Sequence, residues 1–177
     1  MKVACAGICF LVLVVGLSVA DDGKPCEMKV TSVNILCQDK VYTDDVAMAF
    51  TEEGTKLIFN SKGTVKKELP ADAVCEANFY KMTDEGWKKG SFAIDPTPCC
   101  DLVKENEVYV KLAEKHNVPK ECPVKEGSYS VDKWEYDYAP KCEKTPRGEF
   151  KAEFTSKHSS GECLFSYEVV VKVTDKA

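Results

Sequence analysis

The stretch "GEFKAEFTSKHSSGECLFSYEVVVKV" (residues 148–173) contains two runs in which apolar and polar side chains alternate. In the first run Phe150 and Phe154 fall on one face of the chain, with glutamate and lysine on the other. In the second run Phe165 and Tyr167 begin an apolar face that continues through valines. Alternation with a period of two is typical of a β-strand that buries one face. Residues 148–173 therefore predict two strands, separated by a polar, hairpin-like turn.

The rest of the chain repeats this strand pattern in shorter pieces. In "SVDKWEYDYAP" the aromatic residues Trp134, Tyr136 and Tyr138 share one face, and Pro140 ends the run. Further strands are expected at residues 27–36, 46–50, 56–59, 74–82 and 91–94, with glycine- or proline-containing turns between them. Many short strands separated by turn signals predict a mainly β fold, either a sandwich or a barrel.

One helix is expected, over residues 101–116. The side chains that fall near one helical face are Leu102, Tyr109, Leu112, Ala113 and His116. Pro119 follows and prevents the helix from continuing. The chain has no internal repeat, low-complexity tract or long linker, so we expect a single domain over residues 21–177.

The segment "MKVACAGICFLVLVVGLSVA" (residues 1–20) has the features of a secretory signal peptide. It combines one lysine, an apolar run of about a dozen residues and a small-x-small ending at Ser18 and Ala20. The apolar run is short for a membrane span, which needs roughly twenty residues, so a signal anchor is the weaker interpretation. We expect cleavage after Ala20 and a secreted, extracellular protein.

Of the ten cysteines, Cys5 and Cys9 belong to this signal peptide. The others are Cys26, Cys37, Cys75, Cys99, Cys100, Cys122, Cys142 and Cys163. An even number of cysteines in a secreted chain predicts disulfides, here four, although eight cysteines allow 105 pairings and their spacing does not choose among them. Zinc binding is the competing interpretation, but the chain has no C-x-x-C pair and only two histidines.

Neither histidine, His116 or His158, stands in a sequence pattern typical of catalysis. A Ser-His-Asp or Cys-His mechanism needs a histidine with a nucleophile and an orienting group in reach. A cysteine pair, here Cys99 and Cys100, also opens a helix in secreted phospholipases, but the position of their catalytic histidine is apolar in this chain. Motifs for phosphate binding, zinc proteolysis and calcium binding are missing from the sequence. We therefore expect no enzyme, no cofactor and no bound metal.

The formal net charge of −5 at pH 7, with lysines scattered along the chain, argues against two classes of partner. A nucleic-acid-binding protein carries a clustered basic patch. A protein held on anionic lipid carries a basic stripe. The sequence contains neither, so we expect no nucleic-acid partner and no basic attachment to membranes.

The segment "ECPVKEGSYSVDKWEY" (residues 121–136) resembles the ML lipid-recognition family, and most closely its ganglioside-activator branch, which has secreted arthropod relatives. The similarity extends to "CCDLV" at residue 99, to "RGEFKAEF" at residue 147 and to "SSGECLFSYEVVVKV" at residue 159. It covers residues 99–173, whereas before residue 95 only the strand rhythm and Cys26 agree. One departure is the tryptophan-bearing loop of the activator, which "APKCEKTPRGE" replaces here.

This resemblance implies a two-sheet antiparallel immunoglobulin-like β-sandwich that opens like a cup and holds acyl chains or a sterol between its sheets. On sequence alone, aromatic residues on a strand face are more often part of a packed core than of a pocket. The resemblance makes them candidates for the wall of a cavity. The expected wall residues are Phe79, Phe92, Ile94, Trp134, Tyr136, Tyr138, Phe150, Phe154, Phe165 and Tyr167.

The function implied is that of a secreted protein that binds a fatty acid, glycolipid or sterol for transport, presentation or lipid sensing. A receptor or a transient membrane contact would be its further partner. The alternative is a cysteine-rich secreted module that binds a protein partner and has a packed interior. An accessible apolar cavity would separate these two hypotheses.

The resemblance also implies disulfide pairings. Cys122 would pair with Cys100 or Cys99 and thereby pin the helix to the sandwich, and Cys75 would pair with the other member of the doublet. The two remaining pairs expected are Cys26 with Cys163 and Cys37 with Cys142.

Overall fold

The computed structural model of this chain describes residues 25–101, 107–142 and 145–176. The expected signal peptide, residues 1–20, and Leu102 of the expected helix lie outside these ranges. Within them, no helix is long and apolar enough to cross a membrane.

Two antiparallel sheets make up most of the described chain. The strands are β1 (Cys26–Gln38), β2 (Thr43–Glu53), β3 (Lys56–Val65), β4 (Val74–Thr83), β5 (Gly86–Pro98), β6 (Gly127–Asp137), β7 (Gly148–Lys157) and β8 (Cys163–Asp175). The five-stranded sheet has the order β1-β8-β7-β4-β5, and the three-stranded sheet has the order β2-β3-β6. This arrangement confirms the mainly β, immunoglobulin-like sandwich that was expected.

Residues 148–173 form β7 and most of β8, and the two strands pair antiparallel from Gly148 with Val173 to Lys157 with Cys163. Along β7 burial alternates, with Phe150, Ala152 and Phe154 facing inward as predicted. β8 is buried almost continuously from Leu164 to Val171 because it lies between β1 and β7 in the larger sheet. A strand with neighbours on both sides and cover on both faces needs apolar residues at successive positions.

The other predicted strands lie inside observed strands, but the observed strands are longer. Residues 46–50 and 56–59 extend into β2 and β3, which are joined by a tight turn at Gly54 (φ +62°). The predicted helix is found as α3 (Glu107–Lys115). At its C-terminal end it stops one residue earlier than expected, because His116 lies beyond it. A one-turn helix, α4 (Ala139–Cys142), was not expected; Pro140 ends β6 but is tolerated in the first turn of a helix.

A β-bulge in β6 sets which of its side chains face inward. Phe59 pairs with Trp134 and Ser61 pairs with Val131, so β6 has one extra residue at this point. Lys133 lies in the bulge and has a left-handed backbone conformation (φ +49°). Its N–H donates a hydrogen bond to Asn60 Oδ1 at 2.9 Å. Because the bulge shifts the alternation by one residue, Trp134 follows Val131 onto the inner face.

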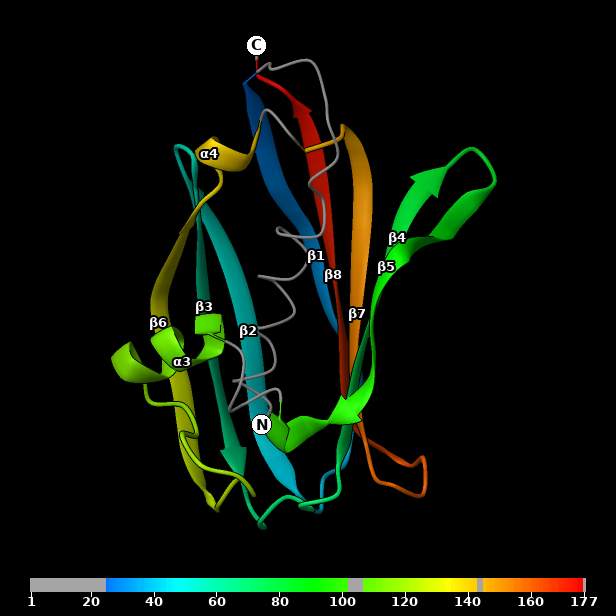
Figure 1. The fold of residues 1–177 in the computed structure, drawn as a ribbon. Helices are drawn as coiled ribbons and strands as arrows, with labels where there is room; N and C mark the ends of the chain where they lie inside the picture. The colour runs from blue at the N-terminus through cyan, green and yellow to red at the C-terminus, as the bar shows by residue number, and fades with distance from the viewer. Residues whose placement is uncertain (1–24, 102–106, 143–144, 177) are drawn as a thin grey trace.

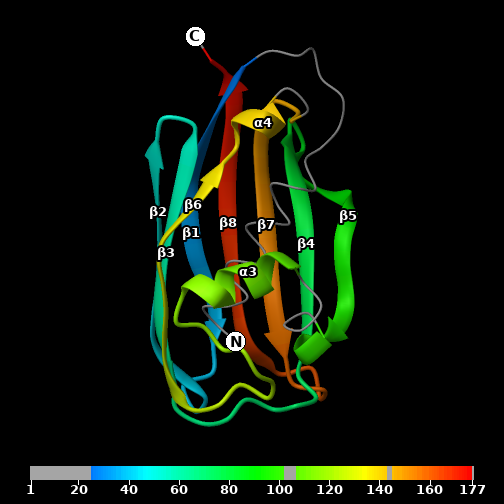
Figure 2. The ribbon, with the colours of Figure 1, turned by 60° about the vertical axis from the view of Figure 1, so that its left-hand side comes forward.

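The two sheets face each other, and at one edge the chain passes directly from one sheet to the other (Figures 1 and 2). At that edge a short connection, residues 39–42, leads from β1 of the larger sheet to β2 of the smaller one. On the other side, α3 lies in front of the gap between β6 and the β4–β5 edge (Figure 2). The interior between the sheets is thus bounded by two sheets and one helix.

The disulfides join Cys26 to Cys142, Cys37 to Cys163, Cys75 to Cys99 and Cys100 to Cys122. The last two confirm that the cysteine doublet is shared between Cys75 and Cys122. Cys100 therefore links the chain ahead of α3 to the segment that leads into β6, so this member of the doublet has a structural role.

The expected pairs Cys26–Cys163 and Cys37–Cys142 are wrong. β1 runs antiparallel to β8, with Cys26 opposite Asp175 and Cys37 close to the start of β8. Cys26 and Cys163 therefore lie at opposite ends of the strand pair, about 40 Å apart along the strand direction at 3.3 Å per residue. The Cys37–Cys163 disulfide follows from the β1–β8 pairing, which was not part of the sequence-based expectation, and Cys26 instead pairs with Cys142 of α4.

Candidate functional site between the two sheets

The larger sheet contributes an aromatic inner face. Phe154 and Tyr167 lie on neighbouring strands with ring centroids 5.6 Å apart, and Phe165 lies 5.7 Å from Tyr167. On β4, Phe79 packs against Phe92 of β5 at 4.9 Å. Ring pairs at these separations stabilise each other beyond the area they bury. Because the pairs follow the strands, they form a continuous apolar surface across the larger sheet.

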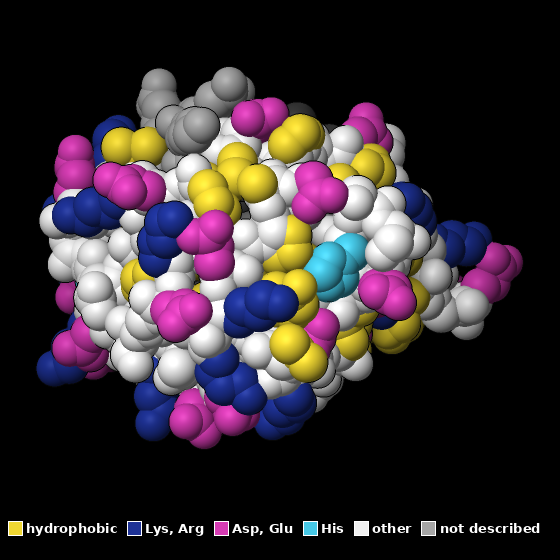
Figure 3. All heavy atoms as spheres, turned by 90° about the horizontal axis from the view of Figure 1, so that it is seen from below, with side chains coloured by type: hydrophobic (Ala, Val, Ile, Leu, Met, Phe, Trp, Pro, Cys, Tyr) yellow, Lys and Arg dark blue, Asp and Glu magenta, His cyan; other side chains and the backbone are white. Residues whose placement is uncertain are grey.

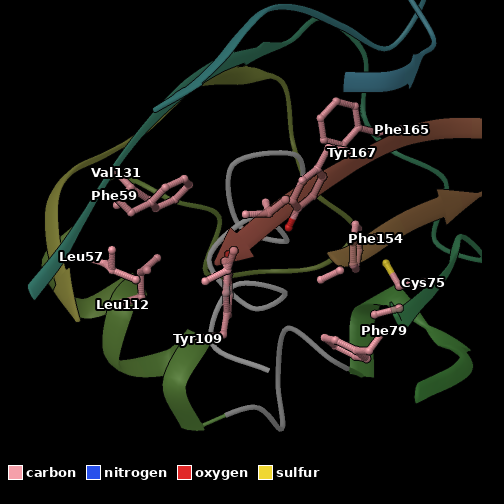
Figure 4. Packing of buried hydrophobic residues seen from close by; sticks show 14 of the residues in the cluster. Leu57, Phe59, Cys75, Phe79, Tyr109, Leu112, Val131, Phe154, Phe165 and Tyr167 are labelled. Atoms are coloured by element: carbon pink, nitrogen blue, oxygen red, sulfur yellow. The ribbon is translucent and has the colours of Figure 1, made fainter. Parts of the chain in front are cut away.

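The smaller sheet presents a second apolar face. Leu57 and Phe59 on β3 and Val131 on β6 are buried, and Phe50 on β2 packs against Phe59 at 4.8 Å. Trp134 and Tyr136 of β6 stack at 6.1 Å and are partly buried. In Figure 4, Leu57, Phe59 and Val131 face Phe154, Phe165 and Tyr167 across the interior.

Burial raises the pKa of Tyr136 to about 12, with a smaller contribution from Asp137. The direction of this pKa shift means that the phenolate is disfavoured where the phenol lies, as expected for a weakly polar environment. The Tyr136 side chain therefore stays neutral at any physiological pH and can act as a hydroxyl, not as a charge.

Helix α3 closes part of the open side. Tyr109, Leu112 and Ala113 of this helix are buried, and Figure 4 shows Tyr109 and Leu112 directed into the same interior. The Tyr109 hydroxyl donates a hydrogen bond to the backbone carbonyl of Pro119. This bond, together with the Cys100–Cys122 disulfide, fixes the apolar face of the helix against the sandwich.

Most of the expected wall residues meet in this interior. The buried ones are Phe79, Tyr138, Phe150, Phe154, Phe165 and Tyr167, and the partly buried ones are Ile94, Trp134 and Tyr136. Phe92 is 42% exposed on the edge strand β5, where its ring packs against Phe79. Tyr138 lies past the end of β6, where its hydroxyl donates to the Gly54 carbonyl at 3.2 Å, so it caps one end of the smaller sheet.

The sequence analysis missed the apolar residues that the smaller sheet and the helix add to the wall. Leu57, Phe59 and Val131 are among them, and Tyr109 and Leu112 come from α3. Leu57 and Phe59 lay within a predicted strand, and their alternation continues through Ser61 to Val65. Extending that strand by this alternation would have placed them on an inner face.

Open hollows in the described part of the chain lie mainly elsewhere. One of about 460 Å³ crosses β2, β3 and β6, with a lining that includes exposed Ala47 and Lys62 and inward-facing Ser61. A neighbour of about 550 Å³ reaches the start of β6, and one of about 160 Å³ lies against α3. Their linings contain none of the expected wall residues. The assignment of those residues to a ligand-binding wall is therefore taken up below as a proposal.

Each of the two histidines contacts neighbouring residues of the fold. His116 follows α3, and its Nδ1 accepts the backbone N–H of Asp132 at 3.4 Å. The His158 ring packs edge-on against Tyr42 at 5.3 Å. Beside it, Ser159 donates directly to Asp72 at 2.6 Å, so the histidine does not stand between the serine and the acid as a general base must.

Side chains of metal-binding type are dispersed over the fold. Within the described residues, His, Cys, Asp and Glu form no group of three or more that could hold a metal ion. Figure 3 shows the end of the sandwich that carries the β1–β2, β3–β4 and β7–β8 connections. Acidic and basic side chains are interspersed there, with small groups of hydrophobic side chains between them.

Comparison with known proteins gives a limited set of similarities. A family model described as "Protein of unknown function (DUF1091)" matches residues 76–152. No curated protein matches the sequence.

Two solved structures are similar to the chain at low sequence identity. One is a Niemann-Pick type C2 protein from Japanese carpenter ant, with 13% identity and a TM-score of 0.32, covering 86% of this chain and 96% of that one. The other is chicken MD-1 complexed with lipid IVa, with 7% identity and a TM-score of 0.33, covering 88% of this chain and 94% of that one. At these TM-scores neither structure bears on what this chain binds.

Proposed function

We propose that this chain is a secreted lipid-binding protein whose single domain, residues 21–177, holds an apolar ligand between its two sheets. One observation carries the proposal. Five ring pairs on the inner faces, among them Phe154 with Tyr167 and Phe50 with Phe59, join residues of the same sheet. In a packed sandwich the side chains of the two inner faces interdigitate. Pairing of rings along each sheet therefore supports the proposal that a ligand lies between the sheets.

Burial of a hydrocarbon chain is sufficient to drive such binding. A chain of about sixteen carbons gains roughly 10 kcal/mol at about 0.8 kcal/mol per CH₂. The cost of association is at least about 4 kcal/mol. The remainder corresponds to micromolar or tighter binding and requires no catalytic group, so the proposed activity is binding, not turnover.

The resemblance of residues 99–173 to the ganglioside-activator branch of the ML family supports the same proposal. It suggests a fatty acid, glycolipid or sterol as ligand, and transport, presentation or lipid sensing as the role. The expected signal peptide suggests that the protein acts outside the cell. A receptor or a membrane that is touched transiently would then receive or supply the lipid.

The nearly complete burial of Phe59 and Phe154 favours a second candidate. If neighbouring side chains alone bury these rings, the interior is packed, and the chain is a cysteine-rich module that binds a protein partner through its surface. Ala152 distinguishes the two candidates, since it lies on the inner face of β7 between Phe150 and Phe154 and is buried.

The test combines native mass spectrometry with one variant. The secreted, oxidised protein is weighed intact, and any bound lipid is extracted with organic solvent and identified. We expect one lipid per protein, and we expect Ala152→Phe to fold but to lose that lipid. A bare protein mass after incubation with mixed lipids would refute lipid binding. An Ala152→Phe chain that no longer folds would point to the packed interior, since overpacking a filled core costs about 1–3 kcal/mol.

A further inference from the structure

Ser61 differs from the other buried serine and threonine residues of the described chain. It lies on β3 between Phe59 and Gly63 and is 6% exposed. Its Oγ is buried and has no hydrogen-bond partner among the residues that the structure describes. The pairing register puts Met48 of β2 and Val131 of β6 directly beside it. All three belong to the inner face of the smaller sheet, so the hydroxyl is directed into the interior.

Three other buried serine and threonine hydroxyls have hydrogen-bond partners. Thr43 Oγ1 donates to the Asp39 carbonyl at 3.1 Å, and Thr145 Oγ1 donates to the Lys141 carbonyl at 2.8 Å. Ser166 Oγ donates to the Phe154 carbonyl at 2.9 Å. A buried hydroxyl without a partner costs its full desolvation energy, so each such group in a folded protein calls for an explanation.

We propose that Ser61 Oγ binds a polar group of the ligand in the middle of the smaller sheet. The inference rests on the proposed function and adds the chemistry of the ligand. An apolar molecule with one hydrogen-bonding group at this depth would satisfy Ser61 and keep its hydrocarbon part against the aromatic faces. The ligand is thus an amphipathic lipid, not a plain hydrocarbon.

The surroundings of Ser61 indicate that this polar group is uncharged. Its neighbours on the inner face are Phe59, Gly63, Met48 and Val131, and none carries a charge. A carboxylate or phosphate at this place would be buried without a counter-ion, which is far more costly than burying a neutral group. A hydroxyl or an ester carbonyl fits, as in a sterol, a fatty alcohol or a fatty ester, while an ionised headgroup would have to lie elsewhere.

The β-bulge next to Ser61 supports a specific role for this part of the sheet. The bulge lies in β6 between the residues that pair with Phe59 and Ser61, and Lys133 takes a left-handed backbone conformation there. Bulges re-aim neighbouring side chains and occur next to functional sites. Non-glycine residues in this conformation persist only where the surrounding structure holds them. Here the bulge brings Val131 beside Ser61 and keeps Trp134 on the inner face.

The test compares matched ligands on matched variants. 5α-Cholestan-3β-ol and 5α-cholestane differ by one hydroxyl, and so do hexadecan-1-ol and hexadecane; all are presented from cyclodextrin and compete with a fluorescent apolar probe. Methyl palmitate serves as the ester probe. Variants Ser61→Thr and Ser61→Val have the same shape and differ in the hydroxyl, which separates hydrogen bonding from packing.

We expect the wild type and Ser61→Thr to prefer the alcohol or the ester over its hydrocarbon by about tenfold, as one buried hydrogen bond predicts. Ser61→Val should lose that preference while it keeps its affinity for the hydrocarbon. Whether the alcohols or the ester show the larger loss identifies the class of group that Ser61 binds. Ser166→Ala is the control, since it removes a buried hydroxyl that already has protein partners, and should leave the preference unchanged.

Two results would overturn the inference, and they are distinguishable. If all probes bind and Ser61→Val has the same preference for the alcohol or ester over the hydrocarbon as the wild type, the chain binds lipid but Ser61 does not bind the polar group of the ligand. If no probe binds to any variant, the proposed function fails and this inference fails with it. Far-UV circular dichroism checks that each variant is folded.

Discussion

The two sheets of the sandwich are held in different ways. In the larger sheet, the Cys37–Cys163 disulfide links β1 to β8, and Cys75–Cys99 links the start of β4 to the residue after β5. Its outer face carries partly buried ion pairs between neighbouring strands. In the smaller sheet, the described strands contain no disulfide, and both non-glycine residues with positive φ, Asp45 and Lys133, lie there.

This difference suggests a division of labour. The larger sheet is a fixed aromatic wall, and its buried serine Ser166 is bound within the protein. The smaller sheet is secured mainly by backbone pairing, and its buried serine Ser61 has its hydroxyl available to a ligand. We expect substitutions in the larger sheet to change stability and substitutions in the smaller sheet to change ligand selection.

The largest effect is expected from removing a disulfide of the larger sheet. The double variant Cys37→Ala/Cys163→Ala opens a loop with a sequence separation of 126 residues. In the chain-entropy account this lowers the free energy of unfolding by about 5 kcal/mol. Urea unfolding monitored by tryptophan fluorescence measures the loss. The control is Cys100→Ala/Cys122→Ala, which removes a disulfide with a sequence separation of only 22 residues and should therefore lower the free energy of unfolding less. A larger loss of stability in the control would contradict the view that the larger sheet carries the stability.

The next effect concerns Lys151, which lies on the outer face of the larger sheet and is 14% exposed. Its ammonium contacts Glu153 at 2.6 Å and Glu168 at 3.6 Å, and these two carboxylates stand opposite each other on β7 and β8. Lys151→Met would leave like charges facing each other. We expect it to destabilise the fold by about 2–3 kcal/mol in chemical denaturation, since breaking a partly buried pair costs somewhat less than breaking a buried one.

Adding Glu168→Gln to Lys151→Met should restore part of this loss, because it removes the repulsion. The matched control is the exposed pair Lys56–Glu135 of the smaller sheet. Lys56→Met should change stability much less than Lys151→Met, as for most surface pairs. Equal losses at Lys56 and Lys151 would remove the distinction between the two sheets.

A smaller effect is expected at the bulge of the smaller sheet. Asn60→Ala removes the acceptor of the Lys133 N–H and should cost about 1 kcal/mol of stability. It should also reduce the preference for the alcohol probes, because the bulge positions Val131 beside Ser61. Lys133→Gly is the control, since glycine adopts this backbone conformation without penalty. If Asn60→Ala changed stability but left ligand preference intact, the bulge would have only a structural role.

The smallest effect concerns pH and His116. Burial and the charge of Lys115 lower the pKa of His116 while Asp132 opposes them, and the neutral ring accepts the Asp132 N–H. Because the folded pKa lies below the unfolded value near 6.5, the unfolded chain binds more protons in this range. Stability from this group is thus complete above pH 6.5 and is lost as pH falls through the folded pKa. His116→Gln should flatten the fall in urea midpoint between pH 7 and pH 5; an unchanged slope would show that His116 does not contribute.

The parts of the fold that the sequence predicts are those with local patterns. The alternation through Phe150 and Phe154 predicts β7, and the helical spacing of Tyr109 and Leu112 predicts the buried face of α3. The ends of β2 and β3 were missed because polar residues such as Thr43 interrupt the apolar pattern, although Thr43 is buried. Local patterns therefore identify the strands but not their full lengths.

The parts that the sequence does not predict depend on distant residues. The bulge at Lys133 needs Asn60 as its hydrogen-bond acceptor, and the two residues come together only once β3 and β6 pair. The Cys37–Cys163 disulfide depends on the antiparallel alignment of the first and last strands, and the Cys26–Cys142 disulfide depends on α4 lying near the start of β1. Ser61 was missed because a serine within a strand is unremarkable until its partners can be counted.

The pairing of β1 with β8 also has a consequence for how the protein is made. Cys26 and Cys37 are synthesised early, but their partners Cys142 and Cys163 come 116 and 126 residues later. Until β8 has been synthesised, β1 has no neighbour in its sheet, and its unpaired backbone can pair with other chains. If the protein is secreted, as we propose, the secretory pathway would need to protect the first strand and keep its two thiols from premature bonds until Cys142 and Cys163 are available.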